Sequence, residues 1–111
     1  MFEEFNFAPG IVSYNDFNID VNISLNRQRD SLKDDLFQVQ FYGKFLIDVG
    51  WYSNLNGKFR IRVIKDYDWT TPLYDKKCKD LKTLNQYMGE SIEMIRTLTE
   101  DLKETIGTID Q

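Results

Sequence analysis

The chain has no histidine and only one cysteine, Cys78, among its 111 residues. Histidine is the side chain most often used as a general base and as a metal ligand, so its absence disfavours most acid–base catalysis and most zinc sites. A Ser–His or Cys–His nucleophile is excluded for the same reason. One cysteine forms no disulfide within the chain, which fits a reducing compartment. We therefore expect a protein that is not an enzyme and that binds no metal or other cofactor.

Phosphate-binding glycine motifs and long apolar runs are missing as well. Neither a P-loop nor a GxGxxG motif occurs. No segment approaches the ~20 apolar residues that span a bilayer. The first ten residues lack the basic start and apolar core of a signal peptide. The two prolines are isolated, and no repeat or linker divides the sequence. We expect one domain over residues 1–111, located in the cytoplasm and without membrane contact.

Basic residues are scarce at both ends of the chain, whose formal net charge is −4. Residues 1–26 carry four acidic side chains and no Lys or Arg, and residues 88–111 carry six acidic and two basic ones. The middle, residues 27–87, carries 12 basic and eight acidic side chains. An acidic chain repels a phosphate backbone, so general nucleic-acid binding is disfavoured. These acids keep a protein soluble, and they also favour a basic protein partner.

Hydrophobic residues make up 41 % of the chain, and eight Phe, six Tyr and two Trp supply bulk for a core. Three segments, 36–42, 45–52 and 58–65, alternate between apolar and polar residues, which is typical of half-buried strands. Gly43-Lys44 suits a type II′ hairpin turn, and residues 53–57 end in Asn-Gly, a strong hairpin signal. Together the three strands share one apolar face, made of Phe37, Val39, Phe41, Phe45, Ile47, Val49, Trp51, Phe59, Ile61 and Val63.

Two further strands are expected before this hairpin series. Residues 5–12 suit a short edge strand that is broken at Pro9-Gly10. Residues 19–25 alternate strictly and predict a half-buried strand. Residues 26–35 are polar apart from one leucine and predict a loop or one short helical turn.

The C-terminal segment predicts a long amphipathic helix. Its apolar residues recur every three or four positions from Leu84 to Ile106, which is one stripe of a helix. Thr83 and Gln86 match a capping box, and Gly107 suits a stop. A helix of roughly 23 residues is about 35 Å long, so its end overhangs an ~8-residue strand. We predict an α+β fold: an antiparallel β-meander of about four to five strands with one long C-terminal helix packed on its apolar face.

Asp48 is the carboxylate best placed for chemistry, because it lies mid-strand among aromatic residues. Arg60 and Arg62 lie on the same face of the neighbouring strand, where opposite charges pair across the ladder. We expect a cross-strand ion pair; contact with a partner and catalysis are the alternatives. Cys78 stands among lysines, which lower a thiol pKa, but with no resolving cysteine we expect a bystander thiol.

The expected partner-binding residues combine aromatic and acidic side chains. Aromatic residues and Arg are the usual anchors of protein interfaces. For Trp69, packing in the core is the alternative to partner binding. Stacking of nucleic-acid bases on Tyr42, Tyr52 and Arg62 is a further alternative, which the acidic chain ends oppose. The predicted partner-binding residues are Tyr52, Asp66, Tyr67, Asp68, Trp69, Glu90 and Glu93.

The central part of the chain contains the segments 45–52 and 59–64, the turn with Gly57 between them, and then Asp68-Trp69 and Pro72-Leu73. This pattern resembles small immunity proteins of bacterial polymorphic-toxin and contact-dependent growth-inhibition systems. The resemblance covers residues 36–98. It implies a cytosolic protein that neutralises a cognate toxin domain by binding it, and the acidic ends suit a basic toxin such as a nuclease. The alternatives are a structural or adaptor protein that forms a homodimer through its long helix, and a small enzyme that uses Asp48.

Overall fold

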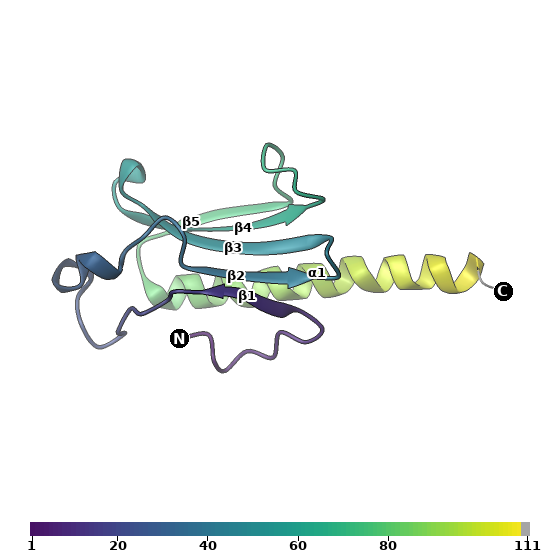
Figure 1. Ribbon diagram of the computed structural model, residues 1–111, viewed down its shortest axis with the longest axis horizontal. Coiled ribbons are helices and arrows are strands. Elements are labelled where there is room, and N and C mark those ends of the chain that lie inside the picture. The colour runs from purple at the N-terminus through teal and green to yellow at the C-terminus, as the bar shows by residue number, and fades with distance from the viewer. Residues whose placement is uncertain (110–111) are drawn as a thin grey trace.

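The protein forms one five-stranded antiparallel sheet and one long helix (Figure 1). The computed structural model describes the backbone of residues 1–109 and the side chains of residues 1–100. The sheet is a meander in the order β1-β2-β3-β4-β5, so each strand pairs with its neighbours in the chain. This confirms the predicted α+β class. The elements are β1 (Ile11–Asn15), β2 (Phe37–Phe41), β3 (Phe45–Tyr52), β4 (Lys58–Lys65), β5 (Tyr74–Cys78), α1 (Leu81–Ile109) and three 3₁₀ turns, η1 (Leu25–Arg27), η2 (Arg29–Ser31) and η3 (Ser53–Leu55).

The core lies between the apolar face of the sheet and the helix. Of the ten residues predicted for that face, nine are buried and Trp51 is half-buried. The helix contributes Leu84, Met88, Ile92 and Ile95, all buried in the same cluster. Each such side chain stabilises the fold by about 1.5–3 kcal/mol relative to an exposed one. The predicted apolar stripe is therefore confirmed as far as Ile95, whereas Leu102 and Ile106 lie outside the described side chains.

The N-terminal segment covers part of the same apolar face. Phe2 is buried, with its ring centroid 4.8 Å from that of Phe37 in β2 and 4.9 Å from that of Phe17. Phe7 also approaches Phe37, at 5.6 Å between centroids. The helix packs mainly against β4 and β5, so these phenylalanines complete the core beneath β2. The predicted edge strand lies later than expected, at β1, because residues 2–10 form turns.

The strand predicted over residues 19–25 does not form. The Asp20 carboxylate accepts a hydrogen bond from the backbone N–H of Asn22, and the Gln28 side chain bonds the backbone of both Asp20 and Ile23. These bonds occupy backbone groups that a strand ladder needs, as Asp and Asn side chains commonly do in turns. Where a loop or one short helical turn was predicted over residues 26–35, the chain forms two short 3₁₀ turns, η1 and η2.

The fifth strand is instead β5, which the sequence pattern did not predict. Its residues, Tyr-Asp-Lys-Lys-Cys, show no apolar alternation. It is held by pairing with β4, in a register that places Cys78 opposite Phe59 and Asp75 opposite Arg62. Cys78 and Tyr74 therefore face the helix, while Asp75 and Lys77 face the other side.

The turn between β2 and β3 differs from the predicted type II′ turn. Phe41 pairs with Phe45, so the turn contains Tyr42 and Gly43 at its centre, with φ of 59° and 64°. Positive φ at both central residues defines a type I′ turn. The Lys44 N–H donates to the Phe41 carbonyl at 3.0 Å and closes the turn.

Both predicted ends of the helix are also corrected. The first residue of α1 is Leu81, and Asp80 accepts hydrogen bonds from the Thr83 N–H at 2.7 Å and the Thr83 hydroxyl at 2.9 Å. Asp80 is thus the N-cap, because a carboxylate satisfies an N–H group that has no partner within the helix. At the other end the helix continues through Gly107, since one glycine weakens a helix by only about 1 kcal/mol.

Candidate functional site

The sheet face turned away from the helix carries polar and aromatic side chains. Figure 1 shows the strands in front of α1, so this face is turned toward the viewer. We call it the polar face, and it consists of Gln38, Asp48, Tyr52, Arg60, Arg62 and Asp75 from the strands, with Trp69 above them.

Asp48 is the centre of the polar face and is only 2 % exposed. Gln38 donates from Nε2 to Asp48 Oδ1 at 2.9 Å, and Arg62 donates from Nη2 to Asp48 Oδ2 at 3.0 Å. The three residues lie directly opposite one another on β2, β3 and β4. The predicted cross-strand ion pair is confirmed, and its partner is Arg62. Because both oxygens of Asp48 already accept hydrogen bonds, its carboxylate acts as a structural link in the network.

Arg60 forms a second ion pair, with Asp75 of β5. The guanidinium donates from Nε to Oδ1 at 2.9 Å and from Nη2 to Oδ2 at 2.7 Å. Hydrogen bonds from this cation hold the pKa of Asp75 below its ordinary value, and those bonds raise the pKa of Arg60. Two-point pairs of this kind fix the geometry of both side chains. The central charges of the polar face are therefore paired within it.

Arg62 also contacts the aromatic rings of Trp69 and Tyr52. Its Cζ lies 5.0 Å from the Trp69 ring centroid and 5.9 Å from that of Tyr52, and its Nη2 donates to the Tyr52 hydroxyl at 3.0 Å. These are cation–π distances. Burial raises the pKa of the Tyr52 hydroxyl above its ordinary value. Trp69 is 42 % exposed, and core packing does not account for it.

The loop between β4 and β5 begins with two residues in the left-handed region, Asp66 (φ 54°) and Tyr67 (φ 61°). The Asp66 N–H donates to the Lys44 carbonyl at 2.8 Å, so this loop lies beside the β2–β3 turn. Tyr67 and Tyr42 are therefore at the same end of the sheet, and they are 69 % and 67 % exposed. Asp68 accepts hydrogen bonds from Thr70 and Thr71 within the loop. These bonds lower the pKa of Asp68 and hold its carboxylate against the loop.

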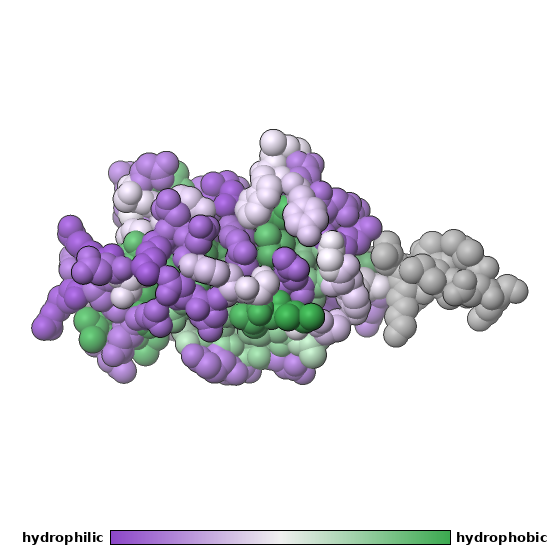
Figure 2. Space-filling view, viewed as in Figure 1, coloured by the Kyte–Doolittle hydropathy of each residue, from purple (hydrophilic) through white to green (hydrophobic). Residues whose placement is uncertain are grey.

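Exposed apolar side chains continue from this end onto the edge strand. Ile11, opposite Gln40, and Tyr14, opposite Gln38, extend the polar face onto β1. Both are exposed, and Ile11 is 71 % accessible. Figure 2 shows hydrophobic side chains on the surface over β1, next to hydrophilic ones. The sequence pattern placed no strand at Tyr14 and could not reveal this continuation.

The helix acids of the predicted set, Glu90 and Glu93, lie in the other layer of the molecule. Glu90 accepts a hydrogen bond from the Tyr74 hydroxyl at 2.8 Å, and burial together with this bond raises the pKa of Tyr74. Glu93 is exposed on the helix. The structure therefore brings Tyr52 and Trp69 together around Arg62 and places the 66–68 segment beside them. It separates these residues from the two glutamates.

The predicted partner-binding residues leave out several members of the polar face, although the sequence analysis had already placed Arg62 on the same face as Asp48. Gln38 and Arg62 were identifiable from strand register, because both lie directly opposite Asp48. Asp75 was not identifiable, since nothing in the residue pattern indicated β5.

Within the described part of the chain, no three His, Cys, Asp or Glu residues are grouped as metal ligands. Burial raises the pKa of the Cys78 thiol to about 11, which opposes the reactivity that neighbouring lysines would give. Among the same residues, no helix is both long and apolar enough to cross a membrane. Comparisons with family models, curated proteins and solved structures found no match to the chain.

Proposed function

We propose that this chain is an immunity protein that binds and inhibits a cognate bacterial toxin domain through its polar face. The observation that carries the proposal is the Arg62 guanidinium between Trp69 and Tyr52, beside exposed Tyr42 and Tyr67. Trp, Tyr and Arg are the residues that contribute most to the affinity of protein interfaces. The acidic chain ends and the resemblance of residues 36–98 support the choice of a toxin as the partner.

The polar face is already ordered without a partner. Asp48 and Asp75 hold the two arginines, and the Asp66 N–H holds the β4–β5 loop against the β2–β3 turn. Ordering side chains at an interface costs about 0.5–1.5 kcal/mol each, and a preorganised surface avoids much of that cost. Such a surface suits the tight binding that inhibition of a toxin requires.

The charge distribution assigns separate roles to the two layers of the molecule. On the polar face the arginines are paired with carboxylates, so a partner meets mainly aromatic and amide groups there. The net charge of −4 and the helix acids attract a basic toxin from a distance and increase the rate of encounter. We place the complex in the cytoplasm, where a nuclease would find its substrate.

The test is an inhibition assay with the toxin domain encoded immediately upstream of this chain. The purified chain, added in excess, is expected to abolish the activity of that domain. Trp69→Ala is expected to weaken inhibition at least tenfold, whereas Glu93→Gln in the other layer is the matched control and is expected to inhibit normally. A toxin domain that stays fully active with excess chain overturns the proposal.

A structural or adaptor role is the second candidate, because α1 runs past the end of the sheet (Figure 1). The longest dimension of the molecule is 58 Å. An amphipathic helix that leaves its sheet suits pairing with a second copy. Light scattering decides the matter, since a mass of 13.2 kDa at every concentration contradicts dimerisation.

A further inference from the structure

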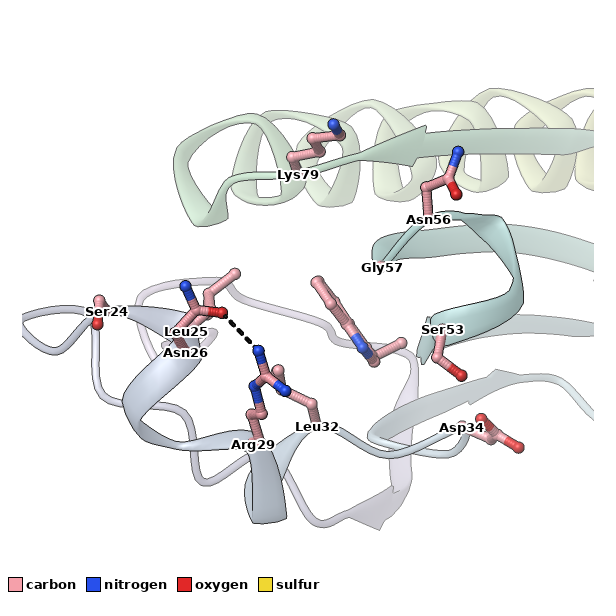
Figure 3. A pocket seen from close by; sticks show the side chains of 11 residues that line it. Ser24, Leu25, Asn26, Arg29, Leu32, Asp34, Ser53, Asn56, Gly57 and Lys79 are labelled. Atoms are coloured by element: carbon pink, nitrogen blue, oxygen red, sulfur yellow. Dashed lines mark hydrogen bonds between the residues drawn. The ribbon is translucent and has the colours of Figure 1, made fainter.

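A concave site lies at the opposite end of the sheet from Tyr42 and Tyr67. It is a cavity of about 770 Å³ between the η1–η2 segment, the η3 turn and the end of β5 (Figure 3). Its volume falls within the roughly 300–1,000 Å³ that small-molecule sites occupy. Its lining includes the Trp51 indole, the cations Arg29 and Lys79, one carboxylate, Asp34, and neutral hydrogen-bonding groups such as Asn26 and Ser53.

The wall formed by the η1–η2 segment is held in place at two points. Gln28 accepts a hydrogen bond from the Asp20 N–H at 2.8 Å and donates to the carbonyls of Asp20 and Ile23 at 2.9 and 2.8 Å. At the other end of the wall, the backbone N–H of Trp51 donates a hydrogen bond to the Lys33 carbonyl at 2.8 Å. A surface loop with this many internal bonds is preformed, which lowers the cost of binding a ligand.

Two cations at this cavity have no carboxylate partner among the described residues, namely Arg29 and Lys79. Within the part of the chain that the structure describes, the Arg29 guanidinium donates only to the neutral Asn26 amide oxygen, at 3.3 Å, and Figure 3 shows this bond beside Leu32. Lys79 lies on the opposite wall. An arginine oriented by a neutral group retains its full charge and most of its donors, which suits a phosphate.

Trp51 provides an aromatic surface in the same cavity. Its ring packs edge-on against Phe59, with 4.9 Å between centroids and 73° between planes. Gly57 lies close beside it, and a Cβ there would approach Trp51 Cζ2 to 2.8 Å. The indole is therefore fixed in orientation and only half-buried. Planar bases stack on aromatic side chains of this kind.

We propose that this cavity binds a mononucleotide, with the base against Trp51 and the phosphate at Arg29. Lys79 adds positive charge at the rim of the cavity. A single nucleotide fits where a long nucleic acid does not, because the net charge of −4 repels an extended phosphate backbone. The site is independent of the polar face and adds a ligand to the toxin-binding role.

The experiment is isothermal titration calorimetry of the unmodified chain with AMP at low salt. Adenosine and inorganic phosphate are titrated separately, and the fluorescence of Trp51 is followed in a Trp69→Phe background. AMP is expected to bind saturably and quench Trp51, and each fragment is expected to bind at least tenfold more weakly. Arg29→Gln is expected to weaken AMP at least tenfold, whereas Arg27→Gln is the matched control, because Arg27 lies in the same segment outside the cavity.

Three results would overturn the proposal. The first is the absence of saturable heat with AMP. The second is equal AMP affinity in Arg29→Gln and Arg27→Gln, which would show that Arg29 does not bind the phosphate. The third is phosphate or adenosine binding as tightly as AMP, which would mean that a planar, anionic ligand is not what the cavity recognises. None of these results depends on the toxin assay, so the two proposals fail separately.

Discussion

Asp48 and Arg62 connect the middle strands of the sheet through opposite charges that are nearly withdrawn from water. Asp48 is 2 % exposed, and the Arg62 side chain is 14 % exposed. Asp48→Asn leaves the guanidinium without its counter-charge, and removing one partner of a buried pair costs about 3–5 kcal/mol. We expect a loss of this order in the free energy of unfolding, measured with urea. Asp30→Asn, on the exposed η2 turn, is the control, and equal stability of the two variants would contradict the prediction.

Gly50 shows a purely steric requirement at one residue. A Cβ on Gly50 would lie 1.9 Å from the Asp34 carbonyl oxygen, which is backbone and has little room to move. Gly50→Ala is therefore expected to destabilise the fold by about 1–3 kcal/mol or more, as overpacking does, and to shift the urea midpoint.

The matched control for Gly50 is Gly43→Ala. At Gly43 a Cβ meets nothing within 4 Å, so that variant is subject only to the strain of a positive φ of 64°. This strain amounts to about 1–2 kcal/mol. If Gly43→Ala lowered stability more than Gly50→Ala, the close approach of Asp34 would not be the constraint at this position.

At the scale of elements, the first turn of α1 depends on Asp80. Its carboxylate accepts two hydrogen bonds from Thr83, which hold the pKa of Asp80 below its ordinary value. Asp80→Ala is expected to lower the free energy of unfolding by about 0.5–2 kcal/mol, the usual effect of losing an N-cap. Thr83→Val separates the two possible caps, because it keeps the N–H bond to Asp80 and is expected to cost less. A larger loss in Thr83→Val would restore Thr83 as the cap.

The edge strand β5 is held by the Arg60–Asp75 pair, whose contribution depends on pH. The pKa of Asp75 is lowered in the folded protein, so as the pH falls the unfolded chain binds a proton there first. The contribution is therefore present above the ordinary value of 3.8 and is lost as the pH falls through the lowered value. Asp75→Asn is expected to be less stable at pH 7, with the difference shrinking at pH 3. Urea unfolding at both pH values tests this, and a constant difference would contradict it.

An element could be predicted from the sequence when the contacts that stabilise it lie close together along the chain. Strands β2, β3 and β4 were predicted because alternation and short turns are local signals. The strand expected at residues 19–25 failed because the side chains of Asp20 and Gln28 bind the backbone first. β5 depends on pairing with β4 and shows no pattern of its own. For the same reason the predicted partner-binding residues are only partly on the polar face. Tyr52 and Trp69 lie on it, whereas Glu90 lies on the helix, which only the folded topology shows.

In the whole molecule, the polar face with Tyr52 and Trp69 lies on one layer, and the helix acids Glu90 and Glu93 lie on the other. A partner bound through the polar face contacts Trp69 directly, whereas Glu93 acts on it only through the long-range field. Contacts at the centre of an interface set the dissociation rate, and remote charges set the association rate and its salt dependence. The two kinds of residue should therefore be separable by kinetics.

Surface plasmon resonance with the cognate toxin domain provides this measurement. Trp69→Ala is expected to raise the dissociation rate at least tenfold and to change the association rate little. Glu93→Lys is expected to slow association by a few-fold at low salt, with the difference vanishing near 0.5 M salt, because the Debye length there is only about 4 Å. Its dissociation rate is expected to match that of the parent chain. If Glu93→Lys instead raised the dissociation rate as much as Trp69→Ala, the helix layer would be part of the contact, and the polar face alone would not be the binding surface.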